Sequence, residues 1–308
     1  MTQHASVSHD ITDAVHILHA GGVVAIPTET VYGLAALARD SDAVEKVFAI
    51  KGRPRSHPLI VHVASLEMAQ LWGVFQYDAL KLGERFWPGP LTLLVPRTSL
   101  VPDWVTCGRY SVAIRIPNHP LTLKLLEVLD DALVAPSANK FGKVSPTTAL
   151  HVVHDLGNEI DLVLDGGECG IGVESTIVEC INGVRVLRPG AISPQEVAAV
   201  IKDDVSSDTS GQSRAPGMLA SHYAPDAQVV LCDSEQEAQN YAHQCHERNQ
   251  KTFVIFEQDV NEYAQKLYSL LRRADDEACD VIIAVRAPDM GIGMAINDRL
   301  MKASAQQN

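Results

Sequence analysis

A basic loop followed by an apolar strand is the part of this sequence with the clearest capacity for chemistry. Lys51, Arg53 and Arg55 fall within five residues of one another, and two prolines keep the loop from continuing a helix. Side chains at this spacing can converge on one polyanion. The strand predicted over residues 59–63 is apolar except for His62. Taken alone, these residues also fit a solvated basic loop and a hydrogen-bonded core histidine.

Several other polar residues fall at predicted strand ends and turns, where α/β proteins usually bind ligands. Arg115 alternates with Val112 and Ile114 in a predicted strand, so its guanidinium should lie on the opposite face, the face of Ala113. The remaining positions are Thr28, Thr30, Ser111, Ser137, Asn139, Ser145, Glu174, Ser175, Thr176 and Arg188. Each single serine or threonine also fits an ordinary turn or cap. Their repeated placement beside strand ends favours one shared pocket.

The composition is that of an ordinary globular protein with an acidic balance. The chain has 308 residues, of which 46% are hydrophobic, and a net charge of −13. This length allows about two domains. The charge argues against a stable nucleic-acid complex, because phosphate neutralisation needs a basic face. A local basic pocket for a small anion remains compatible with it.

Cysteine usage and the N-terminal sequence predict a cytoplasmic protein. The six cysteines show no CxxC pair and no zinc-finger spacing, so we expect reduced thiols and no dedicated metal site. The segment MTQHASVSHD lacks a basic, apolar leader. No apolar run approaches the roughly 18 residues of a membrane span, so no membrane association is expected.

The order of predicted elements indicates a mixed α/β sheet. Helical spacing covers residues 10–20, 41–50, 66–73, 78–87 and 120–129, and strands are predicted over 23–26, 59–63, 91–96, 111–116, 132–135, 161–164, 174–180 and 184–187. Asn182-Gly183 joins the last two strands as a hairpin. Direct hairpins beside helical crossovers imply both parallel and antiparallel strands. A helix over 193–202 begins with a capping box from Ser193 and Glu196.

A polar stretch separates this sheet from a second unit. Residues 203–214 contain almost no apolar side chains and predict a linker. Beyond it, residues 228–232, 235–247, 252–256, 262–274 and 281–285 alternate as β-α-β-α-β, the pattern of a small parallel Rossmann-like unit. The predicted division is an α/β domain over 8–202, a linker and possible lid over 203–226, and a C-terminal domain over 227–308.

Several familiar catalytic devices are missing from the sequence. It contains no GxxxxGK[ST] loop, no GxSxG elbow and no HExxH motif. Gly291-Ile292-Gly293 is only a partial dinucleotide signature, because the third glycine is not at the required spacing. A triphosphate would therefore have to be held without a standard P-loop.

Nine motifs in order along the chain resemble one known family. They are PTETVYGL (27–34), KGRPRSHPLIVHV (51–63), FWPGPLTLLV (86–95), SVAIRIPNHP (111–120), APSAN (135–139), SPT (145–147), ESTIV (174–178), LRPG (187–190) and APGMLASHYAP (215–225). Together they are similar to threonylcarbamoyl-AMP synthases of the YrdC type, in the long form with a C-terminal extension. The resemblance covers nearly the whole chain.

The resemblance implies a twisted mixed sheet with a concave pocket, followed by a linker and a small α/β domain. It also implies a nucleotidyltransferase that condenses ATP, L-threonine and bicarbonate to threonylcarbamoyl-AMP and pyrophosphate. The product would pass to the machinery that makes threonylcarbamoyladenosine in tRNA. Mg²⁺ would accompany ATP, held by phosphates and water rather than by a carboxylate cage, and no tightly bound organic cofactor is implied.

The family motifs also imply roles for individual residues. Lys51 and Arg53 would be catalytic. The ATP site would consist of Lys51, Arg53, His57, Ser111, Ser137, Ser145, Arg188 and Tyr223. The threonine site would consist of Thr30, His62, Arg115, Ala135 and Ser175.

Some positions leave alternatives open. His57 stands where an asparagine would also fit, so it either bonds phosphate or supports the loop. Lys140 and Lys143 stand where relatives resemble SANxSG, and they either contact the ligand or belong to a solvated loop. The segment 203–225, with His222 and Tyr223, is expected to close over the pocket as a lid or to be a passive spacer. The competing functions are an RNA-binding module and carbamoyl transfer to another acceptor.

Overall fold

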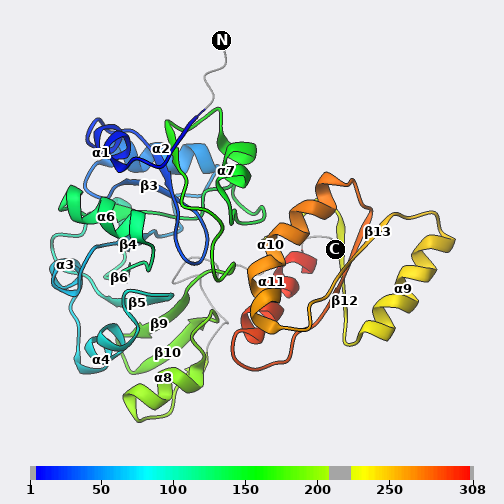
Figure 1. Ribbon diagram of the computed structural model, residues 1–308. Coiled ribbons are helices and arrows are strands. Elements are labelled where there is room, and N and C mark those ends of the chain that lie inside the picture. Colours follow the sequence, from blue (N-terminus) through cyan, green and yellow to red (C-terminus); the bar gives the residue numbers. More distant parts are fainter. Residues whose placement is uncertain (1–4, 208–222, 306–308) are drawn as a thin grey trace.

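The computed structural model describes residues 5–207 and 223–305, which form two α/β units side by side (Figure 1). The N-terminal unit contains a sheet with the strand order β1-β8-β2-β3-β7-β4-β6-β5-β9-β10-β11. The C-terminal unit, residues 223–305, contains a second sheet with the order β12-β14-β13. His222 and the rest of residues 208–222 lie outside the described residues, so the expected lid stays a prediction.

The sheet of the N-terminal unit mixes parallel and antiparallel pairs, as the sequence predicts. Its strands are β1 Ser6–Ser8, β2 Val24–Ile26, β3 Gly33–Leu37, β4 Ile60–His62, β5 Leu91–Pro96, β6 Ser111–Arg115, β7 Leu133–Val134, β8 Leu162–Leu164, β9 Thr176–Cys180, β10 Val184–Arg188 and β11 Ser206–Ser207. β4 pairs with β6 and β5 with β9 in parallel, whereas β5–β6 and β9–β10 are antiparallel. The predicted mixed sheet and the hairpin at Asn182-Gly183 are confirmed.

Helices cover this sheet and fill its main core. They are α1 Ile11–His19, α2 Ser41–Lys51, α3 Leu66–Trp72, α4 Tyr77–Phe86, α5 Asp103–Thr106, α6 Pro120–Leu129, α7 Ala149–Leu156 and α8 Pro194–Ile201. The predicted capping box at the start of α8 is confirmed, since the Ser193 hydroxyl accepts from the Glu196 N–H at 3.2 Å and the Glu196 carboxylate accepts from the Ser193 N–H at 2.8 Å. These bonds satisfy N–H groups that the helix itself leaves unpaired.

Successive side chains of β6 lie on the two opposite faces of the sheet. Val112 and Ile114 belong to the main hydrophobic core. Ala113 instead packs with Ile60 and Ile177 in a small apolar cluster on the other face of the sheet. Because alternate residues of a strand share a face, Arg115 lies on this second face with Ala113. The predicted orientation of Arg115 is therefore confirmed.

Several elements were not predicted from the sequence. The sequence-based assignment lacks β1, β3, α5, α7, β11 and an additional C-terminal helix; β11 lies within the predicted linker and pairs with β10. In the PTETVYGL segment, Thr28 shows the turn that a single threonine was also expected to fit. The Thr28 Oγ1 accepts from the Val31 N–H at 3.2 Å and donates to its carbonyl at 2.6 Å. This closes a turn that leads into β3, so no helix follows it.

The C-terminal unit is the predicted β-α-β-α-β arrangement with one more helix. Its elements are β12 Gln228–Cys232, α9 Glu235–Glu247, β13 Thr252–Ile255, α10 Val260–Asp276, β14 Val281–Val285 and α11 Gly293–Ser304. All strand pairs are parallel. Gly293 begins α11 so close to Pro288 that a Cβ would lie 2.0 Å from the Pro288 carbonyl oxygen. The partial glycine signature here thus has a packing role.

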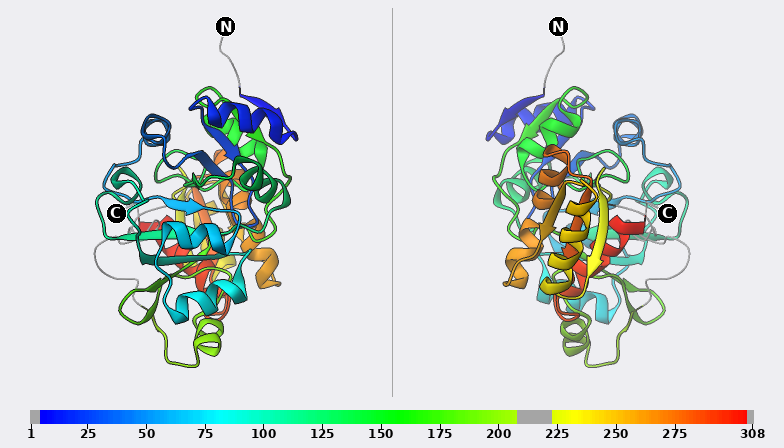
Figure 2. Two further views of the ribbon diagram at one scale, coloured as in Figure 1. Left: turned by 90° about the vertical axis from the view of Figure 1, so that its left-hand side faces the viewer. Right: turned by 90° about the vertical axis from the view of Figure 1, so that its right-hand side faces the viewer.

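Helices α10 and α11 lie between the small sheet and the N-terminal unit, while α9 covers the outer face of that sheet (Figures 1 and 2). One apolar cluster joins Ile282 and Leu267 of the C-terminal unit to Val31, Val144 and Val173 of the N-terminal unit. The Arg272 guanidinium on α10 also pairs with the Asp155 carboxylate at 2.6 Å, with both side chains nearly buried. The two units therefore share a packed interface rather than a simple tether.

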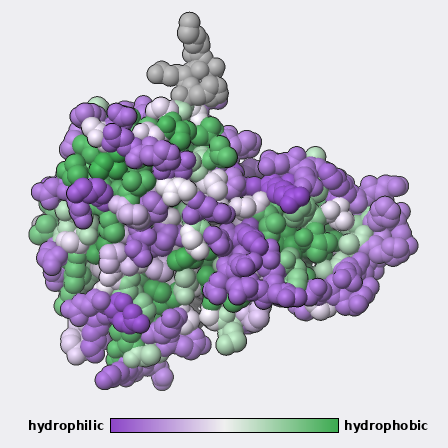
Figure 3. Space-filling model, viewed as in Figure 1, coloured by the Kyte–Doolittle hydropathy of each residue, from purple (hydrophilic) through white to green (hydrophobic). Residues whose placement is uncertain are grey.

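The visible surface is mostly polar. On the face shown in Figure 3, hydrophilic residues form most of the cover and hydrophobic residues gather in separate patches on both units. Scattered apolar surface of this kind is usual for a folded protein. Among the helices of the described residues, none is both long and apolar enough to cross a bilayer.

The contact at Gly172 gives a test of the interface. Gly172 has φ +82°, and a Cβ there would lie 2.4 Å from the Gln265 Cα on α10. Gly172→Ala should therefore destabilise the protein by roughly 2–4 kcal/mol and lower its melting temperature. Thermal unfolding of the full chain measures the effect.

The matched control for this substitution is Gly170→Ala, because a Cβ at Gly170 meets nothing within 4 Å. It should leave the melting temperature nearly unchanged. Equal melting temperatures for the Gly172→Ala variant and the unaltered chain would contradict the interface described above.

Candidate active site

A small cavity of about 60 Å³ brings together residues from distant parts of the chain. Its walls come from the turn before β3, the end of α2, the basic loop, β4, the end of β6, the loop after β7, the segments flanking β9 and β10, and Tyr223. Most residues expected from the family motifs line it: Thr30, Lys51, Arg53, His62, Arg115, Ala135, Ser137, Ser175, Arg188 and Tyr223. The lining thus concentrates four cationic side chains on one face of the sheet.

A larger cavity of about 810 Å³ lies in the C-terminal unit, near the carboxyl ends of its parallel strands. Its charged lining consists of Asp233, Glu235, Glu257, Asp289 and Arg286. This excess of carboxylates does not suit a triphosphate, because like charges at close range repel one another. We therefore place the candidate active site in the smaller, cationic pocket of the N-terminal unit.

Lys51 is fixed by the loop that follows β7. Its ammonium donates to the Ser137 carbonyl at 2.5 Å and to the Asn139 carbonyl at 2.6 Å. Burial and the neighbouring Arg53 lower the pKa of Lys51 well below its usual value, although the two carbonyl acceptors favour the charged form. A polyanion bound nearby would raise the pKa of Lys51 again, because a negative charge favours the ammonium form.

Arg53 is held in place by the backbone of its own loop. Its Nη2 donates to the Pro58 carbonyl at 3.1 Å, and its guanidinium lies 5.8 Å from the centre of the Phe141 ring. Burial lowers the pKa of Arg53 to about 10, which leaves it charged at neutral pH. Arg53 therefore places a permanent positive charge in the pocket lining.

Three of the expected ATP residues, His57, Ser111 and Ser145, lie outside the pocket lining. His57 contacts the Phe141 ring at 5.4 Å, and its carbonyl accepts from the Arg53 Nε at 3.4 Å. The register of β4 and β6, with Ile60 opposite Ala113, places Ser111 next to the loop residues that precede β4. His57 and Ser111 extend the site along the sheet from Arg53, and their contact with a ligand stays a prediction.

Arg115 is surrounded by oxygen atoms. Its Nη1 donates to the Thr30 hydroxyl at 2.8 Å, and its Nε donates to the Gly89 carbonyl at 3.4 Å. Its Nη2 lies 2.6 Å from a carboxylate oxygen of Glu29, although the two groups are not aligned as a hydrogen bond. Thr30 and Arg115 therefore form one polar corner of the pocket, with Glu29 behind it.

His62 faces the same corner with a defined tautomer. Its Nδ1 lies 3.1 Å from the Ile60 carbonyl oxygen, which only accepts, so Nδ1 carries the proton. Burial and then the nearby Arg115 lower the pKa of His62 to about 3. The ring is therefore neutral at physiological pH, and Nε2 is left as a hydrogen-bond acceptor.

Arg188 and Ser175 form the opposite wall. The Arg188 guanidinium donates to the Ser175 carbonyl at 2.9 and 3.0 Å and to its hydroxyl at 3.0 Å. The Ser175 hydroxyl also bonds Thr92 at 2.7 Å. Gly190 allows this approach, since a Cβ there would lie 2.3 Å from the Thr176 nitrogen. The two strand ends at β9 and β10 are thereby locked together.

Glu174 lines the pocket, as its place among the polar residues at strand ends predicts, but the family motifs implied no role for it in ATP or threonine binding. Its carboxylate accepts from the Ser145 hydroxyl at 2.6 Å, from the Tyr268 hydroxyl at 2.8 Å and from the Arg299 Nε at 3.0 Å. Ser145, an expected ATP residue, therefore reaches the pocket lining through Glu174. Tyr268 and Arg299 were missed because they lie on ordinary helices of the other unit, where no local pattern marks them.

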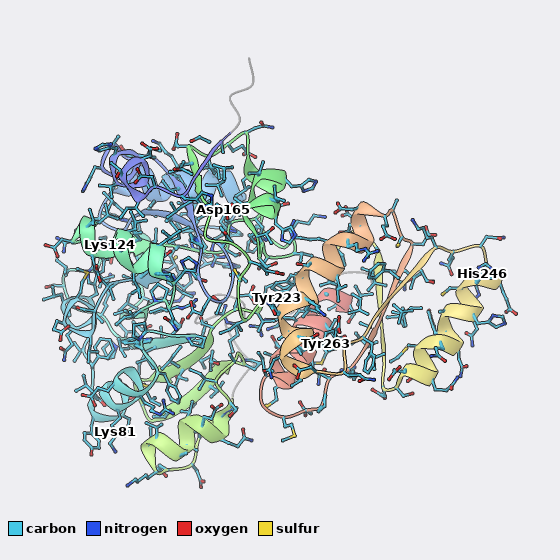
Figure 4. All side chains as sticks on the ribbon, in the orientation of Figure 1. Lys81, Lys124, Asp165, Tyr223, His246 and Tyr263 are labelled. Carbon is cyan, nitrogen blue, oxygen red and sulfur yellow. The ribbon has the colours of Figure 1, made fainter. Side chains whose placement is uncertain are left out.

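Tyr223 marks the junction between the two units (Figure 4). Its side chain is buried and stacks on Tyr268 with the ring centres 5.7 Å apart. Its backbone has φ +64°, and the next residue donates its N–H to the Gly142 carbonyl at 3.0 Å. The chain thus re-enters the described structure directly at the pocket.

The two lysines that depart from the family pattern point to carboxylates. Lys140 Nζ lies 2.5 Å from a Glu159 oxygen, and Lys143 Nζ lies 2.5 Å from an Asp226 oxygen. Both side chains are substantially exposed. These contacts favour the solvated-loop interpretation over a ligand contact.

Two family models together cover most of the chain. Residues 16–190 match the Sua5/YciO/YrdC model, described as telomere recombination, and residues 192–305 match the C-terminal domain of threonylcarbamoyl-AMP synthase. A threonylcarbamoyl-AMP synthase of Bacillus subtilis is 40% identical, over 96% of this chain and 92% of the relative. The chain belongs to the threonylcarbamoyl-AMP synthase family.

A solved structure of this family has the same two-unit fold. Sua5 of Pyrococcus abyssi in complex with L-threonine is 37% identical and superposes with a TM-score of 0.92, over 97% of this chain and 96% of that one. A threonylcarbamoyl-AMP synthase of Pseudomonas aeruginosa is 35% identical over only 57% of this chain, but over 95% of its own length. The family therefore includes long members like this one and members that match little more than its N-terminal unit.

The neutral state of His62 gives a prediction for stability against pH. The folded protein binds a proton at His62 only near pH 3, whereas an unfolded histidine binds one near pH 6.5. Stability from this group is therefore present above pH 6.5 and falls as the pH drops toward 3. Between pH 7 and 5 we expect His62 to account for about 2 kcal/mol of the loss.

Urea denaturation of the unaltered chain and of His62→Gln at pH 7 and pH 5 tests this expectation. The variant should lose about 2 kcal/mol less stability over this range. His243→Gln, on the exposed surface of α9, is the control that keeps the buried ring. The same pH dependence in the His62→Gln variant as in the unaltered chain would contradict the assignment.

Proposed function

We propose that this chain is a nucleotidyltransferase that makes threonylcarbamoyl-AMP and pyrophosphate from L-threonine, bicarbonate and ATP. The observation that carries the proposal is the convergence of Lys51, Arg53, Arg115 and Arg188 on one pocket that also presents Thr30 and His62. Cations suit the triphosphate and the carboxylate, and the small polar groups suit the amine and hydroxyl of threonine. Membership of the family and the threonine complex of the Pyrococcus abyssi relative support the same substrates.

The reaction requires anionic reactants to be held together. Threonine's amine and bicarbonate form an N-carboxylate with loss of water. An oxygen of this carboxylate then attacks the α-phosphorus of ATP and expels pyrophosphate. Because the carboxylates and the triphosphate repel one another, the protein contributes mainly orientation and positive charge. No covalent intermediate with the protein is needed.

We assign the threonine subsite to the corner formed by Thr30, His62 and Arg115. The Arg115 guanidinium is oriented by Thr30 and Gly89, and it would bind the threonine carboxylate. The His62 Nε2 accepts a hydrogen bond, so it suits the amine or the hydroxyl of threonine. Ala135 and Ser175 line the same pocket and would complete the fit around the amino acid.

We assign the nucleotide subsite to Lys51, Arg53 and Arg188, with Ser137 and Tyr223 beside them. His57 and Ser111 would extend it along the sheet. Mg²⁺ would enter with ATP and neutralise phosphate charge. Glu174 is the one carboxylate among the pocket-lining residues, and Arg299 already binds it. The metal would therefore be held mainly by phosphate oxygens and water.

The product would leave the pocket for a tRNA-modifying transferase that installs threonylcarbamoyladenosine. Acyl-adenylates hydrolyse in water, so prompt use by such an acceptor enzyme is chemically necessary. We propose the cytoplasm as the place of action, because ATP, bicarbonate and tRNA meet there. The chain itself would form no stable complex with nucleic acid, in keeping with its net charge of −13.

Arg115→Lys tests the threonine subsite while keeping a positive charge beside Glu29. Lysine loses the planar fork that grips a carboxylate with two hydrogen bonds. The threonine KM should rise by about 10-fold or more, with the ATP KM changed much less. Threonine-dependent pyrophosphate release, measured at varied threonine and varied ATP, separates the two. A threonine KM within twofold of the unaltered chain would remove Arg115 from this role.

Arg53→Met tests the nucleotide subsite. Loss of one charge-assisted contact to the triphosphate should raise the ATP KM by about 10- to 100-fold. The matched control is Arg55→Met in the same loop, because Arg55 is exposed and pairs with Glu45; its ATP KM should stay near that of the unaltered chain. Pyrophosphate release that needs no threonine, or none at all from the unaltered chain, would overturn the proposed function itself.

A further inference from the structure

The C-terminal unit places one completely buried arginine against the wall of the candidate active site. Arg299 on α11 has no exposed surface. Its Nε donates to a Glu174 carboxylate oxygen at 3.0 Å, and its Nη1 donates to the Pro189 carbonyl at 2.8 Å. Glu174 lines the pocket, and Pro189 directly follows the pocket residue Arg188. One side chain of the C-terminal unit therefore contacts both strand ends of this wall.

The same region is tied together by aromatic rings. The Tyr268 hydroxyl on α10 donates at 2.8 Å to the same Glu174 carboxylate oxygen that Arg299 contacts, and the Tyr268 ring stacks on Tyr223. The Arg299 guanidinium lies 5.5 Å from the centre of the Tyr223 ring. Tyr223 is itself a pocket-lining residue. Arg299 thus touches three parts of the pocket wall without lining the pocket itself.

The Glu174 carboxylate lies where its negative charge would oppose the binding of ATP in the reaction proposed above. A triphosphate carries several negative charges, and a buried carboxylate beside it would repel it strongly. Burial would raise the pKa of Glu174, but Arg299, Arg188 and the hydrogen bonds from Ser145 and Tyr268 outweigh burial and lower this pKa to about 2. Glu174 is therefore ionised at neutral pH, and its charge has to be balanced by a cation outside the nucleotide's path.

We propose that Arg299 is the positioning residue by which the C-terminal unit completes the nucleotide pocket. It neutralises Glu174 from behind and fixes the strand ends that carry Ser175 and Arg188. The cations that face the pocket are then available to the triphosphate instead of to Glu174. This inference rests on the proposed function and adds a role for the C-terminal unit.

The arrangement also explains how a separate unit contributes to a site on the N-terminal sheet. Within α11, Arg299 also binds the carboxylate of its neighbour Asp298 at 2.7 Å, and this contact restricts the rotamer of Arg299. Lys302, one turn later on α11, binds the same Asp298 carboxylate at 2.8 Å. The arginine is thus pre-oriented on its own helix before it meets Glu174.

The test compares Arg299→Met with the double variant Glu174→Gln/Arg299→Met in the full-length chain, using threonine-dependent pyrophosphate release. The single substitution leaves Glu174 uncompensated, so the ATP KM should rise at least tenfold, with the threonine KM changed less. The double variant removes the unbalanced carboxylate as well, so its ATP KM should return to within about threefold of the unaltered chain. The control is Arg273→Met on the exposed surface of α10, which should behave like the unaltered chain.

An ATP KM for Arg299→Met within twofold of the unaltered chain would overturn the inference. A double variant no better than the single one would also overturn it, because a purely structural arginine would not be rescued by removing a charge. In both cases the unaltered chain still releases pyrophosphate with threonine, so the proposed function stands. Absence of that activity in the unaltered chain is instead the failure of the proposed function.

A second comparison applies if Arg299→Met does not fold, as judged by circular dichroism. Arg299→Lys keeps the positive charge, and the double variant removes both charges, so each avoids an unbalanced Glu174. Both should then have an ATP KM within about threefold of the unaltered chain. A tenfold or larger increase in both would show that the guanidinium acts through its shape alone and would overturn charge compensation.

Discussion

The burial of several cations around one small pocket is the constraint on which the rest of this structure depends. Lys51, Arg53, Arg115 and Arg188 are each at most 8% exposed. Removing such groups from water costs several kcal/mol per ion unless oxygen atoms replace the water. The structure supplies these oxygens from backbone carbonyls at Ser137, Asn139, Pro58, Gly89 and Ser175. The loops between the strands therefore take the positions that keep these charges satisfied.

The same constraint accounts for the shape of the site. Carbonyl groups can stabilise a cation without neutralising it, so a cation held by carbonyls, such as Arg53, keeps its charge for an anion. Arg115 differs, because the Glu29 carboxylate also lies 2.6 Å from it. The mixed sheet brings the ends of β4, β6, β9 and β10 to one face, and the small apolar cluster around Ile60 and Ala113 forms the floor beside them. A site of this kind acts by placing anions next to one another and needs no nucleophile of its own.

The C-terminal unit is best understood as part of this electrostatic arrangement. Its helices α10 and α11 bring Tyr268 and Arg299 to Glu174, while Arg272 pairs with Asp155 farther along the interface. The Pseudomonas aeruginosa relative matches only 57% of this chain. In this chain, the balancing cation comes from the second unit.

Local sequence signals predicted the elements that depend on neighbouring residues. The capping box at Ser193 and Glu196, the hairpin at Asn182-Gly183 and the β-α-β-α-β order of the C-terminal unit are found as expected. The strand at Gly33–Leu37 was missed because its small residues carry little strand preference and only burial between β2 and β7 selects that conformation. The helix at Gly293–Ser304 was missed because no side chain caps its start, and Gly293 was considered only as part of a partial dinucleotide signature.

The sequence by itself determined the family, the mixed fold and most of the residues that line the pocket, because the family motifs occur in order at recognisable places in the chain. It also determined that Arg115 lies on the face of Ala113, since strand alternation is a local property. Only the tertiary structure decided that Glu29 stands behind Arg115 and that Arg299 and Tyr268 hold Glu174. The physical reason is that these contacts join residues far apart in the sequence, up to 125 positions for Arg299 and Glu174. Glu29 meets Arg115 only when the N-terminal sheet is assembled, and Arg299 and Tyr268 meet Glu174 only when the two units pack together.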